Sequence, residues 1–324
     1  MLPQFAYIRA QSLDEAFVQL EDEGARVSAG GSDLLGCLRD RVFDCTKIVS
    51  LSGVEGLRGI AANGAGLRIG ALTRIAEIAA NPLINERYAV LAQAAGAVAS
   101  PQLRNQGTIG GNICQKPRCW YYRGDFHCKR KGGSTCYALA GENQYHCVLG
   151  GTGCYIVHPS DTAPALVALD ATVRIAGRDG TRTVPIEAFH VSPRDDVQRE
   201  TVLQPGEVVT AIDIPAPGRG FRSSYQKVRA RGSWDFALAG VALALRFDGR
   251  TVTAGRVALS GAAPVPWRAL AVEQAIVGKR LTPEVAARAG AAAVEGATPL
   301  KRNGYKVPLI RNLVREALLA IAKA

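Results

Sequence analysis

Most of the chain's eight cysteines gather in one segment, and cysteine thiolates are the side chains that hold zinc ions and iron–sulfur clusters. The segment contains Cys114, Cys119, Cys128, Cys136, Cys147 and Cys154. In a chain of 324 residues without a signal-peptide pattern at its start, such clustering favours metal ligation over a disulfide framework. A cubane cluster needs four thiolates, so two of the six cysteines must then have another role.

Two loops rich in glycine combine the groups that bind a diphosphate. The first comprises Ala29, Gly30, Gly31, Ser32, Asp33 and Leu34, and the second comprises Thr108, Ile109, Gly110, Gly111 and Asn112. Adjacent glycines let backbone N–H groups approach an anion closely, and hydroxyl and amide side chains add donors. Neither loop has the spacing of a Rossmann or P-loop motif. Together they predict a diphosphate held from two sides.

The charge balance limits the classes of partner. The formal net charge is +11, from 39 Lys and Arg against 28 Asp and Glu. The basic residues are scattered apart from a short run at 128–131, which favours an anionic cofactor or an acidic partner subunit over nucleic acid. No apolar stretch is long enough to span a bilayer. We therefore expect a cytoplasmic protein with no membrane span and no nucleic-acid partner.

The elements that position these residues follow from periodicity and end signals. Residues 12–15 (SLDE) form a capping box that starts the first helix, between predicted strands at 6–8 and 26–29. An apolar pattern predicts a helix over residues 86–98, just before the second glycine loop. A further helix is predicted from Ser160 and Asp161, directly after the cysteine segment. That segment therefore reads as an insertion, at about residues 114–154, between two pieces of one domain.

The last third of the chain reads as a separate unit. Residues 215–220 resemble a linker, and alternating strands follow on either side of a hairpin turn at Asp248 and Gly249. Thr282 is predicted to cap a helix, and the terminal helix has one apolar face. These signals predict one domain over residues 1–217, with subdomains at about 1–55 and 56–217, and a second over residues 221–324.

Five motifs, in order along the chain, resemble one family. They are residues 29–35 (AGGSDLL), 108–113 (TIGGNI), 158–166 (HPSDTAPAL), 225–229 (YQKVR) and 235–237 (DFA). The chain resembles the FAD-binding medium subunit of the xanthine dehydrogenase, aldehyde oxidoreductase and carbon monoxide dehydrogenase family of molybdenum hydroxylases. This resemblance implies an α+β fold: a two-subdomain FAD-binding domain of the vanillyl-alcohol-oxidase/PCMH type, then a small α+β C-terminal domain of the CO dehydrogenase flavoprotein type.

The resemblance also implies roles for single residues. Both glycine loops would hold the FAD pyrophosphate, and Val98 and Val209 would contact the cofactor. Asp161 would lie by the ribityl or isoalloxazine part, and Lys227 would approach the flavin ring, where a cation favours the anionic reduced form. The alternatives are a helix N-terminal carboxylate for Asp161 and a solvated strand lysine for Lys227.

The cysteine segment resembles the loop that ligates a 4Fe-4S cluster in 4-hydroxybenzoyl-CoA reductase and a class of bacterial aldehyde oxidoreductases. Matching the family-like flanks assigns the cluster to Cys119, Cys128, Cys136 and Cys154, with Cys147 as the rival for the fourth place. Cys114 is then a packed thiol near the flavin. The intervals between these cysteines are longer than those of zinc knuckles, which favours the cluster over zinc.

No histidine–carboxylate constellation points to substrate chemistry within the chain, which suits an electron-transfer role. The resemblance implies a molybdenum-cofactor large subunit, a small subunit with two 2Fe-2S clusters and, through the extra cluster, a ferredoxin-like redox partner. Electrons would pass between the 2Fe-2S clusters and an external acceptor or donor through FAD. Two alternatives remain: a stand-alone FAD-dependent oxidase with the same domains, and a zinc-binding interaction module.

Overall fold

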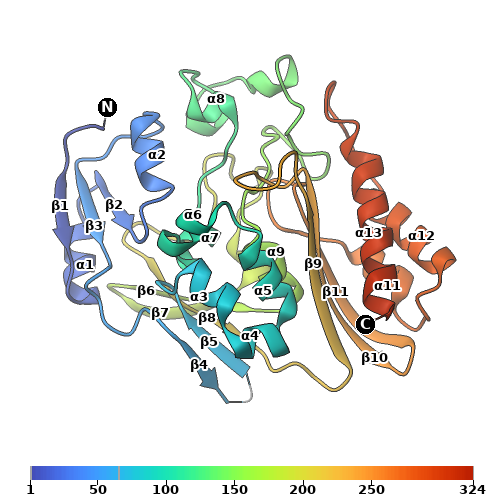
Figure 1. The fold of residues 1–324 in the computed structure, drawn as a ribbon. Helices are drawn as coiled ribbons and strands as arrows, with labels where there is room; N and C mark the ends of the chain where they lie inside the picture. Colours follow the sequence, from blue (N-terminus) through green and yellow to red (C-terminus); the bar gives the residue numbers. More distant parts are fainter. Residues whose placement is uncertain (1, 65, 324) are drawn as a thin grey trace.

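The computed structural model describes residues 2–64 and 66–323. The N-terminal part is a parallel sheet of strand order β1-β3-β2 with two helices (Figure 1). Its elements are β1 (Ala6–Arg9), α1 (Leu13–Leu20), β2 (Ala25–Ser28), α2 (Leu34–Arg39) and β3 (Lys47–Ser50). Ser12 caps α1 as predicted, because its Oγ accepts the N–H of Glu15 at 3.1 Å. The Glu15 carboxylate accepts the N–H of Gln11, one residue before the cap.

A second sheet, antiparallel and of order β4-β5-β8-β6-β7, forms the base of the following part. Its strands are β4 (Ile60–Asn63), β5 (Gly66–Gly70), β6 (Thr172–Gly177), β7 (Gly180–Pro185) and β8 (Val208–Ile214). The helices of this part are α3 (Ile75–Ala80), α4 (Pro82–Arg87), α5 (Ala89–Gly96), α6 (Pro101–Gln106), α7 (Ile109–Ile113), α9 (Thr162–Ala168) and α10 (Ile186–Phe189). Buried residues of both layers form one hydrophobic core.

The prediction of a single helix over residues 86–98 is wrong, because the helical conformation is interrupted at Tyr88. This residue has φ −137° and ψ 47° and separates α4 from α5. Its ring is buried, and its hydroxyl donates to the Pro215 carbonyl oxygen at 3.2 Å. Burying a large aromatic side chain and satisfying its hydroxyl outweigh the local preference for a continuous helix.

The cysteine segment leaves the body of the molecule between α7 and α9 and rises above it (Figure 1). It contains only short helical turns: α8 (Trp120–Arg123), η1 (Lys129–Lys131) and η2 (Tyr137–Leu139). The rest is irregular, so the described part of the segment depends on side-chain contacts for its shape rather than on a hydrogen-bonded ladder.

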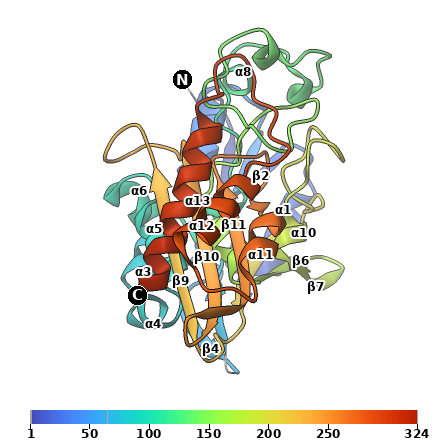
Figure 2. The same ribbon diagram turned by 90° about the vertical axis from the view of Figure 1, so that its right-hand side faces the viewer.

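The last third is an antiparallel sheet of order β12-β11-β10-β9 with three helices against one face (Figure 2). Its elements are β9 (Phe221–Val228), β10 (Ala239–Asp248), β11 (Thr251–Ser260), β12 (Trp267–Arg268), α11 (Leu270–Ile276), α12 (Pro283–Ala292) and α13 (Lys306–Lys323). The predicted hairpin turn is confirmed, with Gly249 at φ 55°, and Thr282 caps α12 through its side chain.

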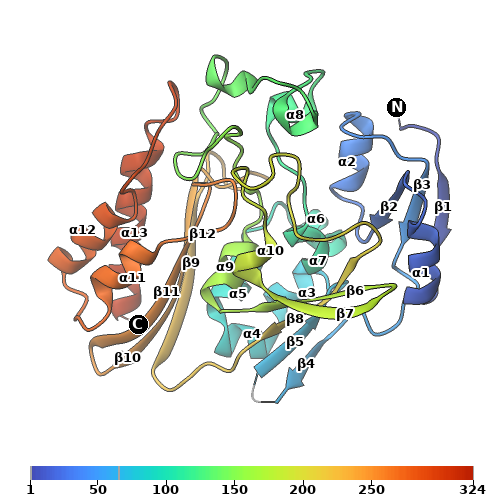
Figure 3. The same cartoon turned by 180° about the vertical axis from the view of Figure 1, so that it is seen from behind.

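The two faces of this sheet belong to different cores. Helices α11 to α13 lie on one side of the sheet, and α5 and α9 lie on the other (Figure 3). Along β10, Val241 and Leu243 belong to the core with α11 to α13, whereas Ala242 and Ala244 belong to the core with α5 and α9. This alternation is the period-two pattern of a strand buried on both sides. The sheet therefore packs firmly on the preceding part. None of the helices in the described ranges is both long and apolar enough to cross a membrane.

Candidate cofactor sites

The two glycine loops lie side by side, as the sequence predicts. A Cβ atom at Gly30 would come within 2.0 Å of the carbonyl oxygen of Gln106, just before the second loop. A Cβ atom at Gly107 would lie 3.7 Å from Ser32 Oγ. Gly31 has φ 70°, a conformation that side chains disfavour. Glycine at position 30 is thus a packing requirement of the loop pair.

The first loop offers free backbone donors. Across the described ranges, no protein acceptor is found for the N–H groups of residues 30–34, at the start of α2. The second loop differs, because Ile109 and Gly110 donate to the carbonyl oxygens of Thr73 and Ala71, and Gly111 donates to Thr108 Oγ1. Consecutive free N–H groups fit an anionic diphosphate. The first loop therefore supplies the amide donors, and the second supplies close packing.

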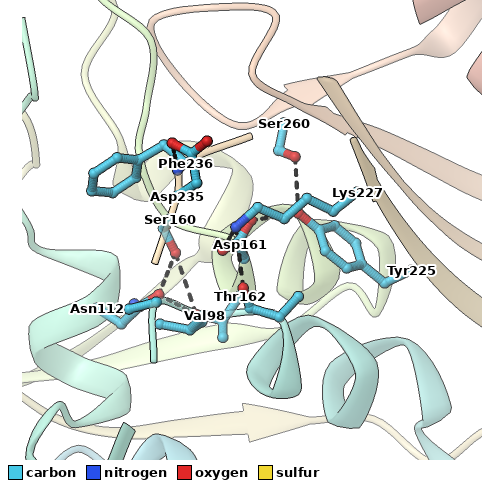
Figure 4. Close-up of polar contacts among 12 residues, drawn as sticks. Val98, Asn112, Ser160, Asp161, Thr162, Tyr225, Lys227, Asp235, Phe236 and Ser260 are labelled. Carbon is cyan, nitrogen blue, oxygen red and sulfur yellow. Dashed lines mark hydrogen bonds and ion pairs between the residues drawn. The ribbon is translucent and has the colours of Figure 1, made fainter. Parts of the chain in front are cut away.

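Polar side chains gather beside the second loop (Figure 4). Asn112 Oδ1 accepts the hydroxyls of Ser160 at 2.5 Å and Thr162 at 2.7 Å. Ser160 Oγ also accepts the N–H of Ala163, so it caps α9 in place of Asp161. The run HPSDTAPAL contains Ser160 and Thr162, but the side-chain roles of these two residues were not predicted. Their spacing of two residues is the only local signal.

Asp161 and Lys227 form a buried ion pair (Figure 4). Lys227 Nζ lies 2.7 Å from Asp161 Oδ2 and also donates to the Ala97 carbonyl oxygen at 3.1 Å. The two side chains are 4% and 6% exposed, which excludes the solvated strand lysine. Tyr225 donates to Asp161 Oδ1 at 2.7 Å, and its oxygen lies 2.9 Å from Ser260 Oγ. Neither Tyr225 nor Ser260 was predicted, although Tyr225 lies two residues before Lys227 on the same strand.

Burial governs the proton equilibria of this group. It raises the pKa of Asp161, while the Lys227 ammonium and the Tyr225 hydroxyl oppose that rise. Burial and the neighbouring Asp161 carboxylate together raise the pKa of Tyr225 well above its ordinary value. The tyrosine is thus a fixed hydrogen-bond donor to the carboxylate. The arrangement holds a charge pair in a water-poor place beside the predicted flavin position.

The remaining predicted contacts fall into different settings. Val98 is half-buried beside the Asn112 cluster (Figure 4), whereas Val209 is a core residue of β8 paired with Ile175. The carboxylate of Asp33 accepts the Lys116 N–H at 2.7 Å and contacts Arg118 at 2.9 Å and Arg123 at 2.7 Å. Asp33 therefore ties the cysteine segment to the first glycine loop.

Four cysteines line one hollow in the raised segment. They are Cys119, Cys128, Cys136 and Cys154, the set that the resemblance implies. Tyr122, Tyr137 and Ile156 supply apolar walls, and His146 places Nε2 3.3 Å from Cys119 Sγ. Burial raises the pKa of Cys119 to about 11 and that of Cys154 in the same direction. Such thiols are inert unless a metal deprotonates them.

The other cysteines of the segment do not line this hollow. Cys147 is 1% exposed, lies beside Gly151, and has a pKa raised by burial to about 12. Burial raises the pKa of Cys114 to about 12 as well. Across residues 2–64 and 66–323, no group of three or more His, Cys, Asp or Glu side chains is placed to hold a single metal ion.

A second carboxylate also fixes the segment to the body. Glu200 accepts Arg130 Nε at 3.0 Å and pairs with Lys116. The Arg130 side chain is 2% exposed and donates further to the carbonyl oxygens of Val197 and Arg199. Asp33 and Glu200 therefore hold the cysteine segment at two points. These contacts position the cysteines of the segment without the help of a metal ion.

Known proteins match this chain along most of its length. Residues 3–217 match the FAD binding domain in molybdopterin dehydrogenase, and residues 223–321 match the CO dehydrogenase flavoprotein C-terminal domain. The aldehyde oxidoreductase FAD-binding subunit PaoB of Escherichia coli (strain K12) is 40% identical over 270 residues, covering 82% of this chain and 83% of that protein. The carbon monoxide dehydrogenase medium chain of Hydrogenophaga pseudoflava is 30% identical over 325 residues, covering 98% and 97%.

Solved structures agree on the fold. Carbon monoxide dehydrogenase from Hydrogenophaga pseudoflava, in a form that lacks the Mo-pyranopterin moiety of the molybdenum cofactor, superposes with a TM-score of 0.78. The sequences are 29% identical, and the match covers 99% of this chain and 98% of the other. The α+β fold with an FAD-binding part followed by the CO dehydrogenase type of C-terminal part is confirmed. The chain therefore belongs to the family of FAD-binding medium subunits of the molybdenum hydroxylases and is a flavoprotein subunit of an oxidoreductase.

Proposed function

We propose that this subunit holds a 4Fe-4S cluster in addition to FAD. In this role it passes electrons between the 2Fe-2S clusters of a small partner subunit and an external acceptor or donor. The observation that carries the proposal is the hollow lined together by Cys119, Cys128, Cys136 and Cys154. A molybdenum-cofactor large subunit would carry the substrate chemistry.

A cubane cluster suits the hollow better than a single ion. Each cluster thiolate binds a different iron, so the four sulfurs surround a space rather than meet at one point. The four cysteines come from separate turns and line one hollow together. Cys154, which lines the hollow, is preferred to Cys147, which does not. Zinc remains the alternative that a metal analysis must decide.

The residues around the glycine loops fit FAD. The free N–H groups of residues 30–34 would bind the diphosphate, and Asn112 with its two hydroxyl partners would face the cofactor's polar middle. Bound flavin would supply exchange of electrons singly or in pairs. The buried pair of Asp161 and Lys227 would position a fixed dipole beside the ring and exclude water. This role differs from that of a free lysine, because the ammonium already has a carboxylate partner.

The surface of the cysteine segment suits a redox partner. Trp120, Phe126, Leu139 and Tyr145 are exposed large hydrophobic side chains of the cysteine segment. The same segment carries the basic run Lys129, Arg130 and Lys131 in η1. Exposed aromatic side chains are typical of protein interfaces, and the net positive charge of the chain would attract an acidic, ferredoxin-like carrier. We further propose a cytoplasmic location, because free cysteine thiols stay reduced there.

The test is cofactor content with spectra. Anaerobically purified protein should contain about one flavin and about four iron atoms per chain. Iron without zinc in the wild type, and loss of iron in Cys136→Ser, would support the proposal. Zinc in place of iron would establish the metal-binding alternative at this segment. Turnover by the isolated chain, without partner subunits, would instead favour a stand-alone oxidase.

A further inference from the structure

One side chain other than cysteine aims a nitrogen at a thiol of the hollow. His146 Nε2 lies 3.3 Å from Cys119 Sγ, within hydrogen-bond distance for sulfur. The imidazole is 5% exposed and lines the same hollow as the four cysteines. Its Nδ1 is buried and has no hydrogen-bond partner among the described residues. The imidazole therefore contacts the Cys119 sulfur through Nε2.

The C-terminal part of the chain fixes the backbone that carries this ring. Asn303 Nδ2 donates to the carbonyl oxygens of His146 and Cys147, at 3.0 Å and 2.9 Å. Lys306 Nζ donates to the carbonyl oxygens of Tyr145 at 3.1 Å and Gly261 at 2.7 Å. Asn303 and Lys306 are both fully buried. His146 is thus held by α13 and the turn before it, independently of the cysteine segment's own short turns.

We propose that His146 is a tuning residue of the cluster, donating its Nε2–H to the Cys119 thiolate and raising the cluster's reduction potential. This inference rests on the proposed cluster. A metal-bound thiolate carries no proton, so the imidazole must be the donor, and the proton must lie on Nε2. In this tautomer Nδ1 carries no hydrogen.

The direction of the effect follows from charge. Reduction adds one electron to the cluster, forms and breaks no bond, and moves no proton. The added negative charge spreads onto the thiolate sulfurs, so an N–H donor stabilises the reduced state more than the oxidised state. Removing the donor should make reduction about tenfold less favourable. For a one-electron couple this corresponds to a fall of about 59 mV.

The first experiment uses the complete wild-type protein labelled with ¹⁵N in histidine only. Electron spin echo modulation of the dithionite-reduced cluster should show a nitrogen coupling that changes with the label. The second experiment is a mediated redox titration of His146→Leu and His146→Gln. The leucine variant should show the lower potential, while glutamine, which keeps an N–H donor, should restore part of it. The flavin potential should stay unchanged in both.

His127→Leu is the matched control. His127 belongs to the same segment, is exposed, and does not line the hollow, so its loss should leave the cluster potential unchanged. Absence of any label-dependent coupling in the wild type would overturn the inference even if His146→Leu fails to hold iron. An unchanged potential in a fully loaded His146→Leu would overturn it too. Wild-type protein without iron would reject the proposed cluster itself and the inference with it.

Discussion

Replacing Lys227 by methionine tests the buried ion pair directly. Methionine matches the lysine stem in length but removes the ammonium, which leaves the Asp161 carboxylate buried with only the Tyr225 hydroxyl as a partner. Breaking one half of a buried pair costs about 3–5 kcal/mol of the free energy of unfolding. The loss of the hydrogen bond to the Ala97 carbonyl oxygen is part of that cost.

The assay is urea unfolding of the flavin-free protein, monitored by circular dichroism. Lys227→Met with Asp161→Asn should recover more than half of the loss, because the uncompensated charge is gone. Arg302→Met is the control, since its pair with Glu142 is 53% and 46% exposed and should cost at most about 1 kcal/mol. Equal losses in Lys227→Met and Arg302→Met would refute the reasoning.

The same variant has a defined pH dependence. Burial already raises the pKa of Asp161 in the folded protein, and removing Lys227 raises it further. A group whose folded pKa lies above its unfolded value binds more protons in the folded state, so stability falls as pH rises between the two values. The gap between wild type and Lys227→Met should therefore be smaller at about pH 5 than at about pH 8. A gap that narrows as pH rises would contradict this account.

Three further outcomes follow. Gly30→Ala should weaken FAD binding at least tenfold, because the added methyl group forces the glycine loops apart. Gly232→Ala is the control, since a Cβ atom there meets nothing within 4 Å. Equilibrium dialysis measures both affinities, and equal values would refute the loop packing. Glu200→Gln should expose the cysteine segment to limited proteolysis, because Arg130 loses its buried carboxylate; an unchanged digestion rate would count against the anchor. Cys154→Ser should lose iron while Cys147→Ser keeps it, and iron analysis showing the reverse would reassign the fourth ligand.

Local signals predicted the element ends well. The cap at Ser12 and the turn at Gly249 each depend on a few neighbouring residues, so the sequence contains all the information they need. The break at Tyr88 was missed because its cause is non-local: the ring is buried in the core and its hydroxyl reaches Pro215. Periodicity alone does not show such tertiary contacts.

The sequence predicted which residues belong to the candidate site better than it predicted which of them contact each other. Asp161 and Lys227 were expected to act separately at the flavin, yet they lie 66 positions apart in sequence and form one ion pair. The role of Asp33 as an anchor of the cysteine segment was likewise invisible, because its partners lie 83 and 90 positions away. The choice between Cys147 and Cys154 depends on the path of an irregular loop. An irregular loop has no periodic pattern of residues from which its path could be predicted.

The measurement that tests the central claim most directly is the absorption and electron paramagnetic resonance spectrum of anaerobically purified protein, before and after dithionite, with iron, zinc and flavin quantified per chain. The account predicts a flavin spectrum, about four iron atoms per chain, and a reduced S = 1/2 signal that disappears in Cys119→Ser. Flavin without iron would contradict the cluster and leave an ordinary member of the family. Zinc without flavin would contradict the whole account.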